Sequence, residues 1–221
     1  MSRVVVVSHD PSWTELYKQE SARLRGALAA AVVAIHHIGS TSIPGIFAKP
    51  IVDILVEATD LTEVDSRNVQ METLGYEVMG ECGIPGRRYF RKDNSVGDRI
   101  HNVHTFLAGT PDVARHLAFR DFMRAHPAHA RSYSDLKRKL ARAHPDSIEK
   151  YMDGKDSFMK EMEERRAQFI KESDERRAAR DKAFEERRAA SKKRHEEFMK
   201  KFNKASTEEV VEEAPAEEKQ S

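Results

Sequence analysis

Residues 37–57 read HIGSTSIPGIFAKPIVDILVE, a polar loop between two apolar stretches. Val32–Ile38, which runs into the loop, is rich in β-branched residues and predicts a buried strand. Ile51–Glu57, which follows the loop, predicts a second strand. A single acid, Asp53, interrupts this second strand. The same stretch therefore carries both the main fold signal and a candidate functional residue.

Side chains alternate between the two faces of a strand, so Val52, Ile54 and Val56 form one apolar face. We expect this face to pack on helices. Asp53 belongs to the opposite, mixed face. A carboxylate among apolar neighbours costs free energy unless it has a partner, a metal ion or a solvent-filled cleft. Asp53 is therefore a site candidate, and an ion pair with an arginine or lysine is its structural alternative.

The loop offers small and hydroxyl-bearing residues that suit an anion. Gly39 permits close backbone approach, and Ser40, Thr41 and Ser42 supply hydroxyls and backbone N–H groups that form a candidate anion-binding nest. The loop is not a P-loop, because it lacks a Gly-Lys-Ser/Thr ending that leads into a helix. An ordinary polar turn remains the alternative.

Composition excludes several classes of protein. The net charge of the 221 residues is +1, and no basic stripe alternates with aromatic residues, so a nucleic-acid partner is not expected. The single cysteine, Cys82, fits a reducing compartment. No apolar run has the roughly 18 residues of a membrane span. We expect a cytoplasmic protein without a membrane segment.

Helical periodicity is strong on both sides of the strands. A helix is predicted over about 12–31, with a capping box from Ser12 to Glu15. Val4–Val7 is a candidate edge strand. These elements predict a mixed α/β (α+β) domain with a small mixed sheet, helices on one face and a helical portion near its C-terminal end. Further helices are predicted over 61–74, 111–126, 128–143 and from 147, and further strands over 76–79, 88–91 and 100–107.

Beyond residue 165 the composition becomes highly charged. Blocks of EERR and DERR with opposite charges four residues apart predict a solvated helix over 166–204. Residues 206–221 hold six Glu and one Lys, which predicts a disordered acidic tail over 205–221. The segment 166–221 reads as an exposed spacer or as a surface for a protein partner. The folded domain is predicted over 1–165.

Several blocks resemble known families. Ile38-Gly39-Ser40 followed by Asp53 resembles the signature of the nucleotidyltransferase (polymerase-β-like) superfamily. The chain is more closely similar to the GrpB family over about residues 5–165. The blocks that carry this resemblance, in the family's order, are HIGSTSIPGIFAKPIVDILV, RRYFRKD (87–93), HNVHTF (101–106), HLAFRDFMRAHP (116–127), YSDLKRKLA (133–141) and YMDGKDSFM (151–159).

The superfamily resemblance implies phosphate binding by Gly39 and Ser40, and a Mg²⁺ ion at Asp53 that assists nucleotidyl transfer. The second acid of the pattern is replaced by Leu55, and His104 stands where a third acid is expected. Leucine has no oxygen ligand and imidazole suits magnesium poorly, so the implied metal site is incomplete. The sequence leaves catalysis open.

Basic residues are spread over the family-like blocks. They form an anion pocket if they converge, and otherwise they are solvated surface charges. Among them, Lys49, Lys137 and Lys155 are the candidate ligand-binding residues, and Tyr151 resembles a family position near the expected cleft. Members of the family joined to dephospho-CoA kinase point to a nucleotide or CoA-like ligand. The six basic residues are Lys49, Arg88, Arg91, Arg120, Lys137 and Lys155.

His101 and His104 lie three residues apart on a predicted strand. They face opposite sides, so they cannot chelate one ion together. One of them can enter the cleft as a hydrogen-bond donor or base.

Overall fold

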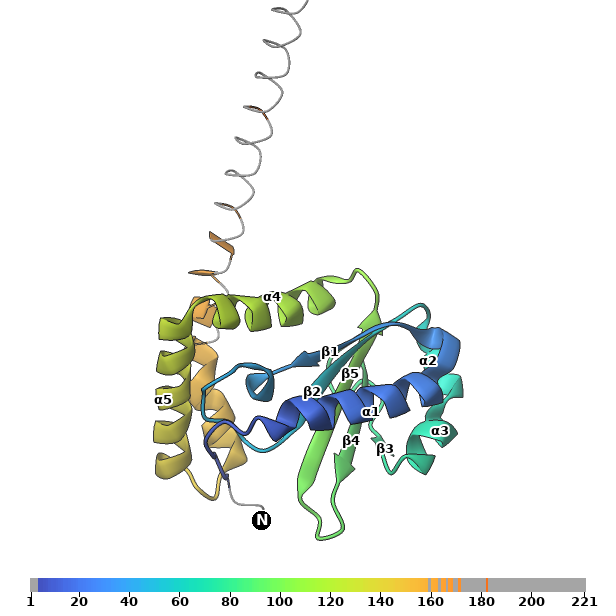
Figure 1. Cartoon of the computed structure of the whole chain (residues 1–221), viewed down its shortest axis with the longest axis horizontal. Helices are drawn as coiled ribbons and strands as arrows, with labels where there is room; N and C mark the ends of the chain where they lie inside the picture. The colour runs from blue at the N-terminus through green and yellow to red at the C-terminus, as the bar shows by residue number, and fades with distance from the viewer. Residues whose placement is uncertain are drawn as a thin grey trace, which may run out of the picture. The chain divides into compact units, whose positions relative to one another are not determined.

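The two apolar stretches that flank the polar loop form neighbouring strands of one mixed sheet (Figure 1). β1 (Val32–Ile38) pairs antiparallel with β2 (Val52–Ala58), and β2 pairs parallel with β5 (Arg99–Leu107). The outer strands are β4 (Arg88–Asp93) and β3 (Glu77–Val78), both joined antiparallel. The sheet order is β1-β2-β5-β4-β3, which confirms the predicted mixed α/β class.

Helices precede, interrupt and follow the strands. The region after α5 continues as a helix over residues 148–158. The α-helices are α1 (Ser12–Leu28), α2 (Leu61–Ser66), α3 (Asn68–Thr73), α4 (Pro111–Ala125) and α5 (Pro127–Ala143), and two short 3₁₀ turns cover Ala29–Ala31 and Ser40–Ser42.

One face of the sheet packs on α1, α2 and α3. The expected apolar face of β2, formed by Val52, Ile54 and Val56, lies in this core. Burial of the apolar side chains in this core is the main stabilising contribution to such a domain. The helical side chains in the same cluster are Trp13, Leu24, Leu28, Val64 and Met71.

The other face of the sheet meets the C-terminal helices. Leu55 of β2 is fully buried here and clusters with Ile38, Phe106 and Val113, the last from α4. A third cluster joins the polar loop to α4, α5 and the helix that follows. Its members are Ile43, Ile46, Phe122, Met123, Ala130, Tyr133 and Met162. The loop and the helices therefore border the same side of the sheet.

Two local predictions are wrong. Val4–Val7 is no edge strand, because Val7 makes only an isolated bridge with Ala48. The Ser12 side chain does not cap α1. Instead, Asp10 Oδ1 accepts a hydrogen bond of 2.8 Å from Ser12 N, since α1 begins at Ser12 and the acceptor must precede it.

The structure is a computed structural model that describes residues 4–158, 160–162, 164, 165, 167, 168, 171 and 182. The chain divides into two units, Met1–Arg166 and Ala167–Ser221, and the fold and the site belong to the first. The predicted charged helix (166–204) and acidic tail (205–221) lie outside the described residues, apart from positions 167, 168, 171 and 182. These two segments stay predictions.

Candidate functional site: a lysine-lined cavity at the end of the polar loop

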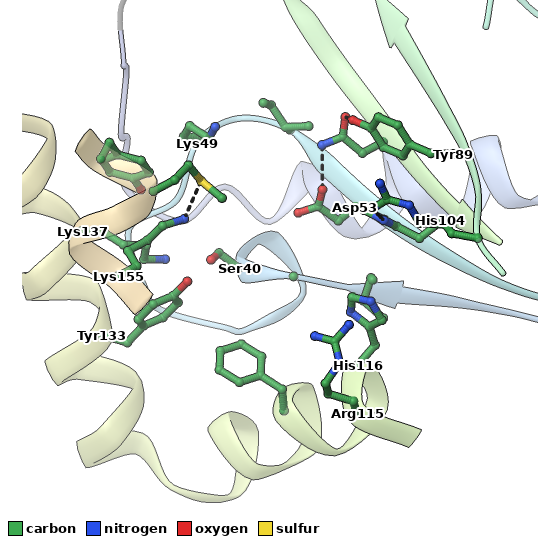
Figure 2. Close-up of a pocket in the computed structure, with 18 residues that line it drawn as sticks. Ser40, Lys49, Asp53, Tyr89, His104, Arg115, His116, Tyr133, Lys137 and Lys155 are labelled. Atoms are coloured by element: carbon green, nitrogen blue, oxygen red, sulfur yellow. Dashed lines mark hydrogen bonds between the residues drawn. The ribbon is translucent and has the colours of Figure 1, made fainter. Parts of the chain in front are cut away.

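A cavity of about 500 Å³ lies between the second face of the sheet, the polar loop and the C-terminal helices (Figure 2). Of the nine candidate site residues, eight line this cavity: Gly39, Ser40, Lys49, Asp53, His104, Lys137, Tyr151 and Lys155. The other lining residues are Ile38, Ile51, Arg87, Tyr89, Asn102, Arg115, His116, Phe119, Tyr133 and Met152.

Asp53 is half-buried on β2, and Figure 2 shows its carboxylate in the cavity. Its Oδ1 accepts a hydrogen bond of 2.9 Å from Asn102 Nδ2. Burial raises the pKa of the Asp53 carboxyl, while the Asn102 hydrogen bond and the charges of the nearby lysines oppose the rise. Within the described residues Asp53 has no ion pair, so the alternative of an arginine or lysine salt bridge is wrong.

Gly39 is packed against Asp53. Its backbone has φ +68°, and a Cβ built at this position would lie 2.3 Å from Asp53 Oδ2. Any other residue would therefore clash with the carboxylate. The glycine predicted to bind phosphate thus also permits the close contact between the loop and Asp53.

Thr41 is the candidate that lies outside the cavity. Its side chain is buried, and Oγ1 lies 3.0 Å from His37 Nε2. Successive side chains of a 3₁₀ turn point about a third of a turn apart, so Ser40 faces the cavity while Thr41 faces the core. The prediction that the Thr41 side chain binds the ligand is thus corrected, because its hydroxyl is directed toward His37 instead.

Two arginines of α4 hold the loop in place, which the sequence did not predict. Arg120 donates to the backbone oxygen of His37 at 3.3 Å, and Arg124 Nε donates to the backbone oxygen of Ser42 at 2.9 Å. The loop is thereby fixed at both ends of Gly39–Ser42. Arg120 consequently acts on the loop from outside the cavity.

Lys49, Lys137 and Lys155 converge from three different elements. Lys137 is 2% exposed, and within the described chain its Nζ has no hydrogen-bond partner. Burial, with the charge of Lys155 adding, lowers the pKa of Lys137 to about 7. Burial, with the charge of Lys49 adding, lowers the pKa of Lys155 to about 8. Burial also lowers the pKa of Lys49.

Tyrosine rings support these ammonium groups. Lys137 Nζ lies 4.4 Å from the centroid of the Tyr133 ring, and Lys155 Nζ lies 4.7 Å from that of Tyr151. Lys155 Nζ also contacts Met152 Sδ at 3.2 Å. Burial raises the pKa of the Tyr133 hydroxyl to about 12, although a hydrogen bond with the Ser40 side chain opposes this rise. Both hydroxyls stay protonated at neutral pH, because burial raises the pKa of Tyr151 as well.

The opposite end of the cavity contains two histidines, His104 and His116, beside the guanidinium groups of Arg87 and Arg115. Burial lowers the pKa of His104 to about 3 and that of His116 to about 4, with neighbouring positive charge adding to both shifts. Arg87 donates to His104 Nδ1 at 3.5 Å, which places the remaining imidazole proton on Nε2. His104 is therefore the histidine that enters the cavity, whereas His101 is buried on the other side of the sheet, near Glu20.

The remaining predicted basic residues lie elsewhere. Arg88 pairs with Asp65, Arg91 with Glu77, and Arg120 with Asp121. Each has a carboxylate partner and none lines the cavity, so these three arginines are not part of the anion pocket. Of the six basic residues considered in the sequence, the three lysines line the cavity, and Arg87 and Arg115 add two cations that the sequence did not single out.

Metal ligands are sparse around Asp53. Leu55 stands at the position of the second acid and is fully buried against Ile38, Phe106 and Val113. This position therefore offers neither a side-chain oxygen nor room for a water molecule as a metal ligand. The register partner of Asp53 on β5 is Asn102, an amide. Among the described residues no group of three or more His, Cys, Asp or Glu side chains could hold a metal ion. The donor set does not fit a two-ion magnesium site.

Fold and cavity together define a class: a mixed α/β domain whose strand–loop–strand unit and C-terminal helices enclose a cation-rich cavity. The chain belongs to the GrpB family, because the family's model, described as GrpB protein, matches residues 3–165. A crystal structure of conserved protein GrpB from Enterococcus faecalis matches with a TM-score of 0.71 and 42% identity, over 75% of this chain and 99% of that one.

Two curated relatives extend this comparison. UPF0157 protein YqkA of Bacillus subtilis is 45% identical over 162 residues, which are 73% of this chain and 47% of YqkA. A dephospho-CoA kinase of Mycobacterium leprae is 26% identical in an alignment of 180 residues that covers 70% of this chain and 44% of the kinase. The chain thus spans about half the length of YqkA and less than half of the kinase. In the described part of the chain no helix has the length and apolar character needed to cross a membrane.

Proposed function

We propose that the chain binds a nucleotide or a related phosphorylated ligand, CoA-like compounds included, in the lysine-lined cavity. The observation that carries this proposal is the environment of the Lys137 side chain. Its ammonium group is buried in the cavity wall and has no hydrogen-bond partner among the described residues. A buried cation without a partner is costly, and an anion at this position would remove the cost.

The charge balance of the cavity supports an anionic ligand. Lys49, Lys137 and Lys155 face a single carboxylate, that of Asp53. The mutual repulsion of the lysines contributes to their lowered pKa values. A phosphate group among them would raise these pKa values and form charge-assisted hydrogen bonds. Ser40 and the tyrosine hydroxyls would supply further neutral donors.

The size of the cavity supports a ligand larger than inorganic phosphate. Small-molecule sites typically have volumes of about 300–1,000 Å³, and this cavity has about 500 Å³. The similarity to a part of a dephospho-CoA kinase agrees with a ligand of this kind but names none for this chain. Membership of the nucleotidyltransferase superfamily, Mg²⁺ at Asp53 and nucleotidyl transfer stay predictions. So do a protein partner at 166–221 and a cytoplasmic location.

Calorimetry on the full chain tests the proposal. ATP, GTP, CTP and CoA are each titrated with and without Mg²⁺, into the wild type and into Lys137→Gln. Lys139→Gln on the same helix is the matched control, because Lys139 is exposed and does not line the cavity. We expect binding of at least one ligand, a loss of about tenfold or more in Lys137→Gln, and a change below about twofold in the control. Absence of binding by all four ligands would contradict the proposal.

A further inference from the structure

Beside Asp53 the structure places an amide where a metal site needs a second acid. Asp53 and Asn102 are register partners on the parallel strands β2 and β5, and their side chains share the cavity face. The preceding proposal says only that the lysines bind phosphate. The amide–carboxylate pair indicates which other part of the ligand is recognised.

The orientation of Asn102 is fixed from both sides. Tyr89 donates its hydroxyl proton to Asn102 Oδ1 at 2.8 Å, and Asn102 Nδ2 donates to Asp53 Oδ1 at 2.9 Å. Since the amide oxygen is occupied by a donor, the amide N–H must face Asp53. The chain Tyr89–Asn102–Asp53 therefore presents an acceptor, the second carboxylate oxygen, at its end.

This second oxygen, Oδ2, points toward the cavity, as Figure 2 shows. On its other side it packs closely against Gly39, where a Cβ would lie 2.3 Å from Oδ2. Figure 2 shows Asp53 on the same side of the cavity as Tyr89 and His104, with the lysines and Tyr133 at the opposite end. The cavity therefore has a lysine end, and an opposite end where Asp53 supplies a hydrogen-bond acceptor in the company of Arg87 and Arg115.

Asp53 does not neutralise the lysines itself. It forms no ion pair with Lys49, Lys137 or Lys155 within the described residues, although their charges act on it. A ligand that spans the cavity can therefore engage both ends at once. It must carry phosphate for the lysines and a hydrogen-bond donor for the carboxylate.

We infer that Asp53 binds a sugar hydroxyl of a phosphorylated ligand directly, without a metal ion, while Lys49, Lys137 and Lys155 bind its phosphate. The inference rests on the proposed function and narrows it to nucleotides and sugar phosphates that retain a free hydroxyl. Asn102 and Tyr89 also line the cavity, and their role here is that of positioning residues, because their hydrogen bonds orient Asp53. Hydroxyl recognition by a carboxylate is charge-assisted and discriminates strongly against analogues that lack the hydroxyl.

The test compares three kinds of probe in the presence of EDTA. Full-length wild type and Asp53→Asn are titrated with inorganic tripolyphosphate, with ATP, GTP and CTP, and with the 2′,3′-dideoxy form of each nucleotide. In the wild type we expect at least one nucleotide to bind about tenfold tighter than its dideoxy form. In Asp53→Asn this ratio falls below about threefold, whereas the affinity for tripolyphosphate does not fall. The variant presents an amide N–H where the carboxylate oxygen stood, so the charge-assisted bond is lost.

Tyr89→Phe provides a second variant that leaves the carboxylate in place. Loss of its hydroxyl leaves Asn102 Oδ1 with the longer bond of 3.5 Å from Arg99 Nη1 and so loosens the orientation of the amide. We therefore expect a smaller, two- to fivefold reduction of the hydroxyl preference and unchanged tripolyphosphate binding. The inference is overturned if nucleotides bind only with Mg²⁺, if the wild type does not prefer the hydroxylated forms, or if Asp53→Asn keeps the preference. If neither tripolyphosphate, nor any nucleotide, nor CoA binds the wild type, with or without Mg²⁺, the proposed function itself fails.

Discussion

Asp53 and Asn102 face each other across two parallel strands, joined by a hydrogen bond of 2.9 Å. An aspartate in place of Asn102 would have nearly the same shape. One atom therefore separates this cavity from a site with two adjacent carboxylates, because oxygen would replace the amide nitrogen. An amide and a carboxylate form a hydrogen bond with each other, whereas two adjacent carboxylates repel each other unless a cation binds between them.

Asn102→Asp is expected to create a divalent cation site. Two adjacent carboxylates repel each other, so the variant should be less stable than the wild type in EDTA. Millimolar Mg²⁺ or Mn²⁺ should raise its free energy of unfolding by about 1–3 kcal/mol, since the ion binds only the folded chain. Thermal denaturation with and without the ions measures this. Gln70→Glu, at an exposed position of α3, controls for added charge. An equal response of the wild type would show that Asp53 alone holds the ion.

Lys137→Met is expected to stabilise the chain in a pH-dependent way. The pKa of Lys137 is about 7 in the fold and 10.5 at its ordinary value. Between these pH values the unfolded chain binds the extra proton, so the stability of the wild type rises with pH through this window. The methionine variant lacks this dependence. Each pKa unit corresponds to about 1.4 kcal/mol, so the gain from the substitution should be largest below pH 7 and should disappear toward pH 10.5.

Urea denaturation of wild type and Lys137→Met at pH 6, 8 and 9.5 checks this expectation. Lys139→Met, on the exposed side of α5, should show a difference from the wild type that does not vary with pH. A constant difference for Lys137→Met as well would mean that the Lys137 amine is hydrated rather than buried.

Gly39→Ala is expected to damage both the fold and the site. The methyl group would enter the space of Asp53 Oδ2, and the backbone there has φ +68°. Strain and displacement together should cost about 2–4 kcal/mol of unfolding free energy. Gly26→Ala in α1 is the matched control, because nothing lies within 4 Å of a Cβ at that position. This control should gain about 0.5–1 kcal/mol from helix propensity, and chemical denaturation measures both.

The sequence predicted the fold where its signal was local. Apolar alternation identified β2 and placed Val52, Ile54 and Val56 in the core, as the structure confirms. Asp53 was a candidate because a lone acid in such a strand must face something polar. The structure places it at a cavity, and its role there stays a prediction. Local pattern was misleading at Val4–Val7, where β-branched residues make only one bridge.

The sequence could not reveal contacts that depend on strand order. Asn102 and Tyr89 act on Asp53 because β5 lies between β2 and β4 in the sheet. The spacing of residues along the chain does not predict this strand order. The alternation in HNVHTF did contain one usable signal, since it places Asn102 and His104 on a single face. Tyr133, one helical turn before Lys137, lines the cavity as well, and the sequence analysis did not single it out.

The buried, neutral histidines of the cavity should reduce the stability of the fold at acidic pH. Burial lowers the pKa of His104 to about 3 and that of His116 to about 4, from an ordinary value of 6.5. As the pH falls below 6.5, the unfolded chain takes up protons that the folded chain does not, so stability is lost toward pH 4. His104→Gln should reduce the loss between pH 7 and 5 by about 1–2 kcal/mol. His144→Gln, outside the cavity, controls for the substitution itself. If the His104 ring resonances titrate near pH 6.5 in NMR spectra of the wild type, water reaches this end of the cavity, and the imidazole is not held neutral.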